Sequence, residues 1–101
     1  MLIVGFDWDK ANSEKCEKHG LSKETIEAVF TRRVRVHPDV KHSSLEDRFI
    51  AAGLTSDGRP VFVGFTFREA ESGMFIRPIT ARYMHAGEAR KYVETFAEDD
   101  Q

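Results

Sequence analysis

The stretch that decides the fold runs from Leu54 to Phe67 and reads Leu-Thr-Ser-Asp-Gly-Arg-Pro-Val-Phe-Val-Gly-Phe-Thr-Phe. Its first half contains Ser56-Asp-Gly-Arg59, and an Asp-Gly pair at such a place is typical of a tight turn between two β-strands. From Val61 to Phe67 every second residue is apolar, which is the period of a strand with one buried face. The stretch therefore predicts a β-hairpin.

Further strands are predicted on both sides of this hairpin, over residues 2–6, 34–36, 45–54 and 74–82. We expect His37-Pro-Asp39 to break the second of these strands. Pro78 lies inside the last one, and because proline donates no backbone hydrogen bond, it favours a sheet edge or a bulge there.

Three helices complete the pattern, over residues 9–18, 22–30 and 85–96. Asp9 and Ser22 are suitable N-cap residues, and Gly20 is a suitable stop after the first helix. Spacings of four and three residues place Asn12, Cys16 and His19 on one face of that helix. The first two helices therefore form an α-hairpin.

Apolar residues of the second and third helices lie at core spacing, and these are Ile26, Val29, Phe30, Ala89, Tyr92, Val93 and Phe96. One strand, two helices, four strands and a last helix follow one another, which predicts an α+β fold. We expect an antiparallel meander of four or more strands, with an N-terminal helical hairpin and a C-terminal helix on one face.

The composition is typical of one small globular domain. The 101 residues suffice for a single core, which we place in residues 1–97, and residues 98–101 form an acidic tail. No apolar run approaches the roughly 20 residues that cross a bilayer, so no membrane segment is expected. With one cysteine, Cys16, no intrachain disulfide can form, and a cytoplasmic location is expected. The net charge of −2 predicts only weak long-range attraction to nucleic acid.

Charged residues that suit phosphate chemistry gather first in two places. Lys18-His19 ends the first helix, where basic side chains either contact a phosphate or only complement the helix dipole. His42 precedes Glu46-Asp47-Arg48, where strand alternation places Glu46 and Arg48 on one face and Asp47 on the other. Either Glu46 and Arg48 form an exposed ion pair, or a carboxylate or imidazole here moves protons beside an arginine.

Arg77 and Arg82 form the third such place. A separation of five residues points them to opposite faces of a regular strand, so they share one phosphate only if Pro78 marks a bulge or Arg82 lies beyond the strand. Otherwise they are an exposed strand end. The four histidines and Cys16 show no metal-binding spacing, so neither a metal nor a cofactor is expected. These residues by themselves indicate phosphate handling and nothing narrower.

A set of short motifs occurs in order along the chain: Trp8-Asp9, Asn12, Lys18-His19-Gly20, His42-Ser43, Glu46-Asp47-Arg48, Asp57-Gly58-Arg59, Arg77, Ala81-Arg82, Glu88 and Tyr92. This set resembles the BrnT family, small toxins of bacterial type II toxin–antitoxin systems, over residues 6–94. The resemblance implies a fold like that of RelE ribonucleases. It also implies a metal-independent endoribonuclease that slows growth by cutting RNA.

The resemblance further implies an antitoxin partner like BrnA, with a ribbon-helix-helix part that binds DNA. Because ribbon-helix-helix proteins are dimers, we expect a 2:2 complex. Operator DNA would be bound only through the antitoxin, which fits the acidic balance of this chain.

Carried over residue by residue, the resemblance gives catalytic roles to His42, Glu46, Arg48, Arg77 and Arg82, and substrate-binding roles to Lys18 and His19. His42 or Glu46 would be the base, and the three arginines would stabilise the charge of a phosphorane. The substrate-binding pair would hold the RNA backbone or protonate the leaving oxygen.

The chain departs from the family pattern at Pro78, Thr80 and Ala89, and these departures bear on activity rather than on the fold. They leave open a catalytically degenerate module that binds an antitoxin without cutting RNA. A small enzyme acting on another phosphate-bearing substrate is a third interpretation.

Overall fold

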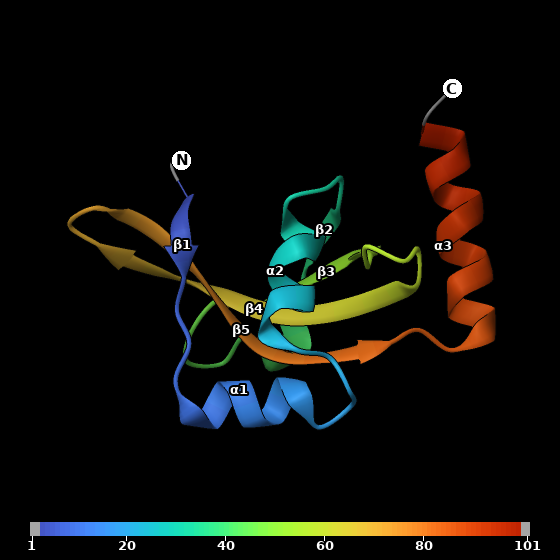
Figure 1. The fold of residues 1–101 in the computed structure, drawn as a ribbon. Helices are drawn as coiled ribbons and strands as arrows, with labels where there is room; N and C mark the ends of the chain where they lie inside the picture. The colour runs from blue at the N-terminus through green and yellow to red at the C-terminus, as the bar shows by residue number, and fades with distance from the viewer. Residues whose placement is uncertain (1–2, 100–101) are drawn as a thin grey trace.

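A five-stranded sheet organises the chain in this computed structural model, which describes residues 3–99 and the side chains of residues 3–95 (Figure 1). The strands are β1 (Ile3–Phe6), β2 (Arg35–Pro38), β3 (Phe49–Leu54), β4 (Pro60–Ala70) and β5 (Gly73–Tyr83). Within the same residues the helices are α1 (Lys10–Glu17), α2 (Lys23–Phe30) and α3 (Ala86–Asp99), with a short 3₁₀ helix at Val40–His42. The predicted α+β class is confirmed.

The sheet is mixed, so the prediction of an antiparallel meander is wrong at one edge. Strands β2 to β5 pair antiparallel in sequence order, whereas β1 adds to β5 in parallel, with Phe6 opposite Ile76. The order across the sheet is β1-β5-β4-β3-β2. Apolar alternation identifies a strand but not its partner, which is why it did not place the first strand beside the last.

The two N-terminal helices begin at the predicted caps, and α2 ends at Phe30 as predicted, whereas α1 ends at Glu17, one residue before the predicted Lys18. Asp9 caps α1 by accepting a hydrogen bond from the Asn12 backbone N–H, and the Asn12 side chain accepts one from the Asp9 N–H in return. Ser22 caps α2 by accepting from the Thr25 N–H. Between the helices, Gly20 has a φ of 85°, a left-handed conformation that glycine adopts without strain.

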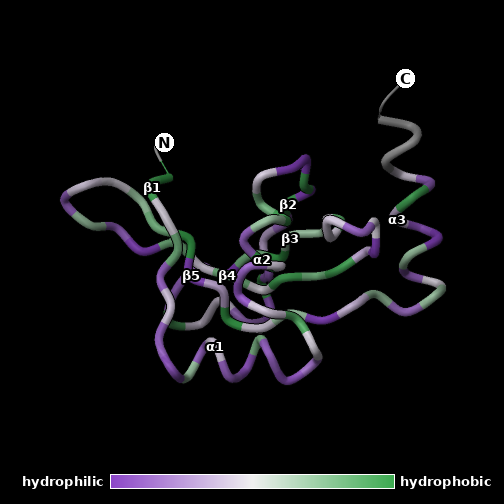
Figure 2. Tube along the Cα trace, in the orientation of Figure 1, coloured by the Kyte–Doolittle hydropathy of each residue, from purple (hydrophilic) through white to green (hydrophobic). Residues whose placement is uncertain are grey.

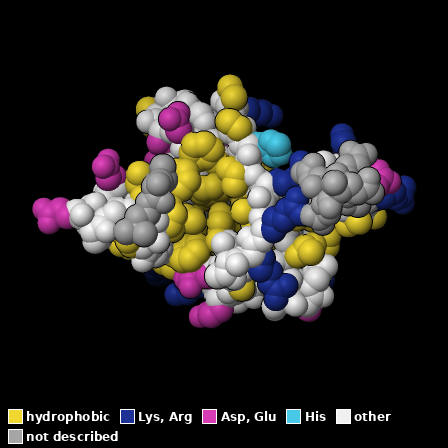
Figure 3. Space-filling view, turned by 90° about the horizontal axis from the view of Figure 1, so that it is seen from above, with side chains coloured by type: hydrophobic (Ala, Val, Ile, Leu, Met, Phe, Trp, Pro, Cys, Tyr) yellow, Lys and Arg dark blue, Asp and Glu magenta, His cyan; other side chains and the backbone are white. Residues whose placement is uncertain are grey.

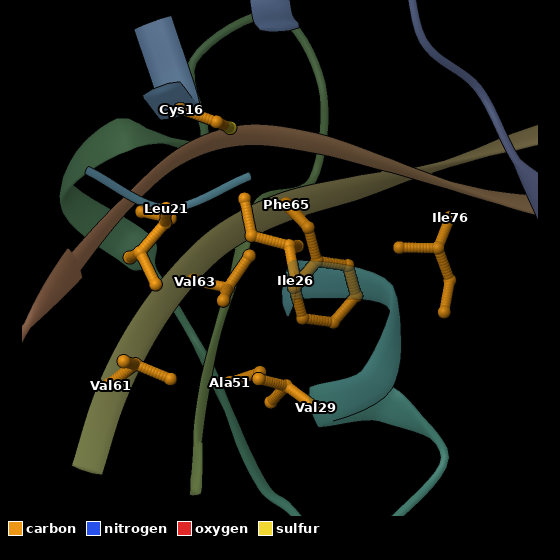
Figure 4. Close-up of a cluster of buried hydrophobic side chains, with 10 residues drawn as sticks. Cys16, Leu21, Ile26, Val29, Ala51, Val61, Val63, Phe65 and Ile76 are labelled. Carbon is orange, nitrogen blue, oxygen red and sulfur yellow. The ribbon is translucent and has the colours of Figure 1, made fainter. Parts of the chain in front are cut away.

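The core packs side chains of both helices against the sheet (Figure 4). Its buried members are Cys16, Leu21, Ile26, Val29, Ala51, Val61, Val63, Phe65, Ile76 and Ala81. Phe65 contacts the partly buried rings of Phe30, Phe49 and Phe67 in a row of aromatic residues, which Phe6 extends by contacting Phe30. Contacting centroids lie 5.2 to 5.7 Å apart. Because Val61, Val63 and Phe65 enter the core, the alternate residues of β4 face away from it.

A buried asparagine ties α1 to the sheet. The Asn12 Nδ2 group donates to the carbonyl of Pro78 in β5 at 2.8 Å and to the carbonyl of Asp7 at 3.0 Å. The neighbouring Trp8 Nε1 group donates to Glu27 Oε2 in α2 at 2.8 Å. The motif that begins at Trp8 and ends at Asn12 therefore holds the two helices and the last strand together.

Pro78 marks a bulge in β5, which is one of the two placements that its sequence position favours. Gly64 pairs with Thr80 and Phe65 pairs with Pro78, so Ile79 is the extra residue on β5. The strand lies inside the sheet, between β1 and β4, and Pro78 is buried. The bulge therefore accommodates the proline inside the sheet, so Pro78 does not require an edge strand.

The boundaries of β2 and β3 differ from the prediction. Strand β2 continues through His37 and Pro38, because it is an edge strand and an edge tolerates a missing N–H donor. Strand β3 begins at Phe49 rather than at Leu45, whose side chain is 99% exposed. The charged run before Phe49 is therefore a loop.

Helix α3 projects from the body of the molecule instead of lying along the sheet (Figure 1). The predicted core position is right for Tyr92, which is buried, and wrong for Val93, which is 55% exposed. The side chain of Phe96 lies outside the described residues. Arg35 Nη2 donates to the Thr95 carbonyl at 3.3 Å, which joins α3 to β2.

Polar and apolar residues are unevenly spread over the fold. Hydrophilic residues dominate α1, whereas β4 contains a hydrophobic stretch (Figure 2). In the face seen from above, hydrophobic side chains fill the middle and Lys and Arg side chains gather along one side (Figure 3). Among residues 3–99, no helix has the length and apolarity that crossing a membrane requires.

Candidate active site

A cleft of about 550 Å³ opens over β3, β4 and β5, and α1, the β2–β3 segment and the start of α3 also contribute to it. Its charged and titratable side chains are Lys15, Asp39, His42, Arg48, Arg82 and Glu88. The structure thus brings three of the seven predicted site residues into one cavity, namely His42, Arg48 and Arg82.

His42 forms a pair with an aspartate that precedes it by three residues. The 3₁₀ turn at Val40–His42 brings His42 Nδ1 to 2.8 Å from Asp39 Oδ2. Asp39 is the better shielded partner, with 18% of its side chain exposed against 59% for His42. A carboxylate at Nδ1 favours the tautomer that has its proton there, so Nε2 is left to accept a proton.

The loop before β3 is closed by a serine hydroxyl. Ser43 Oγ donates to the Asp39 carbonyl at 2.6 Å and accepts from the Arg48 backbone N–H at 2.9 Å. The Asp39 N–H donates in turn to the Arg48 carbonyl at 2.7 Å. These bonds hold His42 and Arg48 at the same end of the cleft.

The predicted ion pair between Glu46 and Arg48 is present, with 3.5 Å between Arg48 Nε and Glu46 Oε2. The prediction that strand alternation sets their faces is wrong, because both residues precede the start of β3. Glu46 lies in an adjoining hollow of about 360 Å³, which shares His42 and Arg48 with the cleft.

Arg82 meets Glu88 in a two-pronged ion pair at the other side of the cleft. Arg82 Nη1 and Nη2 donate to the two Glu88 carboxylate oxygens at 2.9 and 3.0 Å. Glu88 also accepts from the His85 N–H at 2.8 Å, as in the capping box of a helix. The hydrogen bonds from Arg82, followed by that from His85, lower the pKa of Glu88 to about 2. The guanidinium of Arg82 lies 5.1 Å from the centre of the Phe62 ring.

Arg77 lies apart from this cleft although the bulge puts it on the same face of β5 as Arg82. With Ile79 as the extra residue, Arg77 pairs with Thr66 and Arg82 with Phe62, two β4 positions of the same parity. Arg77 turns instead to α1, where its Nη2 donates to Asp9 Oδ2 at 2.8 Å.

The Asp9 carboxylate, which accepts the hydrogen bond from Arg77, also caps α1. The hydrogen bond from the Asn12 backbone, and then that from Arg77, lower the pKa of Asp9. Only 15% of the Arg77 side chain is exposed. Its neighbours therefore give Arg77 a structural role at the start of α1.

Lys18 and His19 are exposed in the turn after α1, and neither contributes to the cleft. Lys15, one helical turn earlier, contributes instead. The predicted face of Asn12, Cys16 and His19 is buried only at its first two members, because α1 ends at Glu17.

Sequence reasoning did not single out Lys15 or Asp39, and it gave Glu88 no role. Signals were present for two of them. Asp39 precedes His42 by three residues, a separation that one helical turn closes. Glu88 follows His85 by three residues, which is the capping-box spacing at a helix start.

The cleft combines a possible proton acceptor with several cations. These groups suit a reaction in which a nucleophile displaces a leaving group at a phosphate. His42 is the side chain that could accept a proton, and Lys15, Arg48 and Arg82 are the cations that line the cleft with it. The described residues contain no group of three or more His, Cys, Asp or Glu side chains placed to bind a metal ion. Cys16 is buried in the core, and burial raises the pKa of its thiol to about 11, so it does not supply a thiolate.

Comparison with known proteins agrees with this chemistry. The profile of one protein family matches residues 8–88, and that family is described as the ribonuclease toxin BrnT of a type II toxin–antitoxin system. A search among curated proteins found no match. The matched residues include every charged side chain of the cleft, and they confirm the resemblance indicated by the sequence motifs. The chain therefore belongs to the BrnT family of type II toxin–antitoxin ribonuclease toxins, which implies an RNA substrate and an antitoxin partner.

Proposed function

We propose that this chain is a metal-independent endoribonuclease whose active site is the cleft and whose general base is His42. The observation that carries the proposal is the 2.8 Å contact between His42 Nδ1 and Asp39 Oδ2 in a cavity that also holds Arg48 and Arg82. Asp39 orients the imidazole, and Nε2 is the nitrogen that accepts the proton.

The reaction follows from the groups around the cleft. His42 takes the proton of a ribose 2′-OH, and the 2′ oxygen forms a bond to the adjacent phosphorus. The bond from phosphorus to the 5′ oxygen breaks, which leaves a 2′,3′-cyclic phosphate and a 5′-hydroxyl end. Arg48 and Arg82 stabilise the negative charge that develops on the phosphoryl oxygens, and Lys15 gives a proton to the leaving oxygen.

Of the two predicted bases, His42 is favoured over Glu46. His42 lines the cleft together with Arg82, whereas Glu46 lies in the adjoining hollow against Arg48. In this proposal Glu46 orients Arg48. Lys15 takes the role that the resemblance gave to Lys18 or His19, because it alone of the three contributes to the cleft.

The antitoxin is proposed to be a BrnA-like ribbon-helix-helix protein, which would contact operator DNA for the complex. Each dimer of such an antitoxin would hold two toxin chains, in a 2:2 complex. The net charge of −2 supports DNA binding through the antitoxin, because an acidic chain is only weakly attracted to DNA phosphates over long distances. We place the reaction in the cytoplasm, where RNA is available.

Of the three departures from the family pattern, only Thr80 lines the cleft. Pro78 is buried at the bulge, and Ala89 is half-buried in α3. Thr80 contributes to the cleft beside Gly64. Activity is therefore favoured over a degenerate antitoxin-binding module.

A growth experiment separates these two functions. The chain is expressed alone in bacterial cells, and colony counts are compared for the unchanged chain, His42→Gln and His37→Gln. His37 is exposed on β2 and does not line the cleft, so its variant is the matched control. We expect the unchanged chain and His37→Gln to arrest growth and His42→Gln to permit it. Equal growth of all three strains, with folded protein present, would favour the degenerate module.

A further inference from the structure

We infer that Phe62 and the guanidinium of Arg82 form a stacking subsite for one unpaired nucleobase of the RNA. This inference rests on the proposed function, because it places the base beside the phosphate that the cleft acts on. It names a contact for the base, whereas the groups described so far act on the phosphate and the ribose.

The position of Phe62 in β4 turns it away from the core. Its neighbours Val61 and Val63 are completely buried in the core, whereas Phe62 is half-buried and lines the cleft. A large apolar ring on the open side of a sheet gains less from burial than its neighbours do. Core packing therefore does not account for an aromatic residue at this position.

The other aromatic rings near the cleft already have partners. Phe49 and Phe65 belong to the row of rings that extends the core, and the ring of Tyr83 is covered by the Arg59 guanidinium at 3.6 Å. Within the described part of the chain, Phe62 makes no ring–ring contact, and its partner is the Arg82 guanidinium at 5.1 Å. Phe62 thus presents an aromatic surface to the cleft.

Two small residues lie next to Phe62 on the sheet. Its cross-strand neighbour on β3 is Ala52, and two residues along β4 is Gly64. A Cβ atom at Gly64 would lie 3.1 Å from Thr80 Cγ2, so the glycine also lets β5 approach closely. Gly64 and Thr80 both line the cleft next to Phe62, so the cleft itself, and not a gap above the glycine, is the space that a planar ligand would enter.

The charges around the ring select a nucleotide over a purely apolar ligand. The Arg82 guanidinium lies against Phe62. Within the described residues, its bonds to Glu88 and Tyr83 use both Nη1 hydrogens and one Nη2 hydrogen, and they leave Nε–H and the second Nη2–H available. A phosphate on those donors would bring its own base toward Phe62. Unpaired RNA bases bind proteins by stacking on aromatic rings and on arginine planes, and this contact tolerates every base.

A double-mutant cycle with abasic RNA tests this subsite. A short single-stranded RNA that the chain cleaves is made with a 2′-O-methyl group at the cleavage position, so that it binds without reacting. Abasic residues are then placed one at a time on both sides of that position. Fluorescence anisotropy gives Kd for the full chain, for Phe62→Leu, for Phe62→Tyr and for Phe75→Leu. Phe75 is a half-buried β5 residue that does not line the cleft, so it is the matched control.

We expect one abasic position to weaken binding of the unchanged chain by about tenfold. Phe62→Leu should bind the intact RNA about tenfold more weakly and show no further loss at that position. Phe62→Tyr and Phe75→Leu should behave like the unchanged chain. An abasic penalty that is the same in Phe62→Leu as in the unchanged chain would overturn the subsite and leave the ribonuclease proposal standing. Failure of the unchanged chain to bind and cleave any RNA would overturn both.

Discussion

The two-pronged pair between Arg82 and Glu88 leads to a prediction about pH. Because the pKa of Glu88 falls to about 2 in the folded chain from an ordinary value of 4.5, the pair stabilises the fold above about pH 4.5. That stabilisation is lost as the pH falls toward 2. In Arg82→Gln we expect the Glu88 pKa to rise toward 4.5, since the His85 N–H alone remains as a donor.

An NMR titration of the Glu88 side-chain carboxyl measures this pKa. Arg68→Gln is the matched control, because Arg68 is exposed on the same sheet and lies outside the cleft. A Glu88 pKa that is equal in Arg82→Gln and Arg68→Gln would show that the ion pair does not govern it.

Asn12 carries the second prediction at the scale of single residues. It is 4% exposed, and its side chain joins Asp7, Asp9 and Pro78 through three hydrogen bonds. Asn12→Ala leaves buried groups without partners, so the free energy of unfolding should fall by about 1–3 kcal/mol. Urea denaturation measures the change, and Ser13→Ala, one residue along α1, should stay within about 0.5 kcal/mol of the unchanged chain. A loss below about 0.5 kcal/mol for Asn12→Ala would contradict this role.

At the scale of elements, the loop from Asp39 to Arg48 decides the geometry of the proposed site. Ser43 fastens both ends of it, so Ser43→Ala should lower the rate of RNA cleavage by about 10- to 100-fold through misplacement of His42 and Arg48. Single-turnover kinetics measure this loss. Ser44→Ala is the control, because the neighbouring Ser44 is exposed, and Ser43→Thr should recover much of the rate. Cleavage by Ser43→Ala at the unchanged rate would show that the loop needs no such fastening.

Elements that local chemistry defines were predictable from the sequence. The hairpin turn at Asp57-Gly58, the caps Asp9 and Ser22, and the stop at Gly20 lie where expected, because each depends on residues next to it. The start of β3 was not predictable in this way, since residues 43–48 are held as a loop: Ser43 Oγ accepts from the Arg48 N–H, and Thr66 Oγ1 donates to the Asp47 carbonyl. A partner as far along the chain as Thr66 leaves no periodic signal near residue 47.

In the whole molecule, more residues belong to the sequence motifs than meet in the cleft. Arg77 and Arg82 have the same chemistry in one strand, yet only Arg82 lines the cleft, because Asp9 holds Arg77 at the start of α1. Lys18 and His19 follow the helix that contributes to the cleft, but α1 ends before them. The residue of α1 that lines the cleft is Lys15. Spacing identified the residue types of the site, and the packing of α1 on β5 decided which of them meet.

Cleavage by the purified chain measures whether this cleft cuts RNA without a metal ion. The full chain, free of antitoxin, is incubated with RNA in EDTA, and the new 3′ ends are analysed for cyclic phosphate. We expect cyclic ends from the unchanged chain and from the controls His37→Gln and Arg68→Gln. For His42→Gln and Arg82→Gln the rate should fall by about 100-fold or more. Cleavage that EDTA abolishes, or that both cleft variants retain in full, would contradict the account.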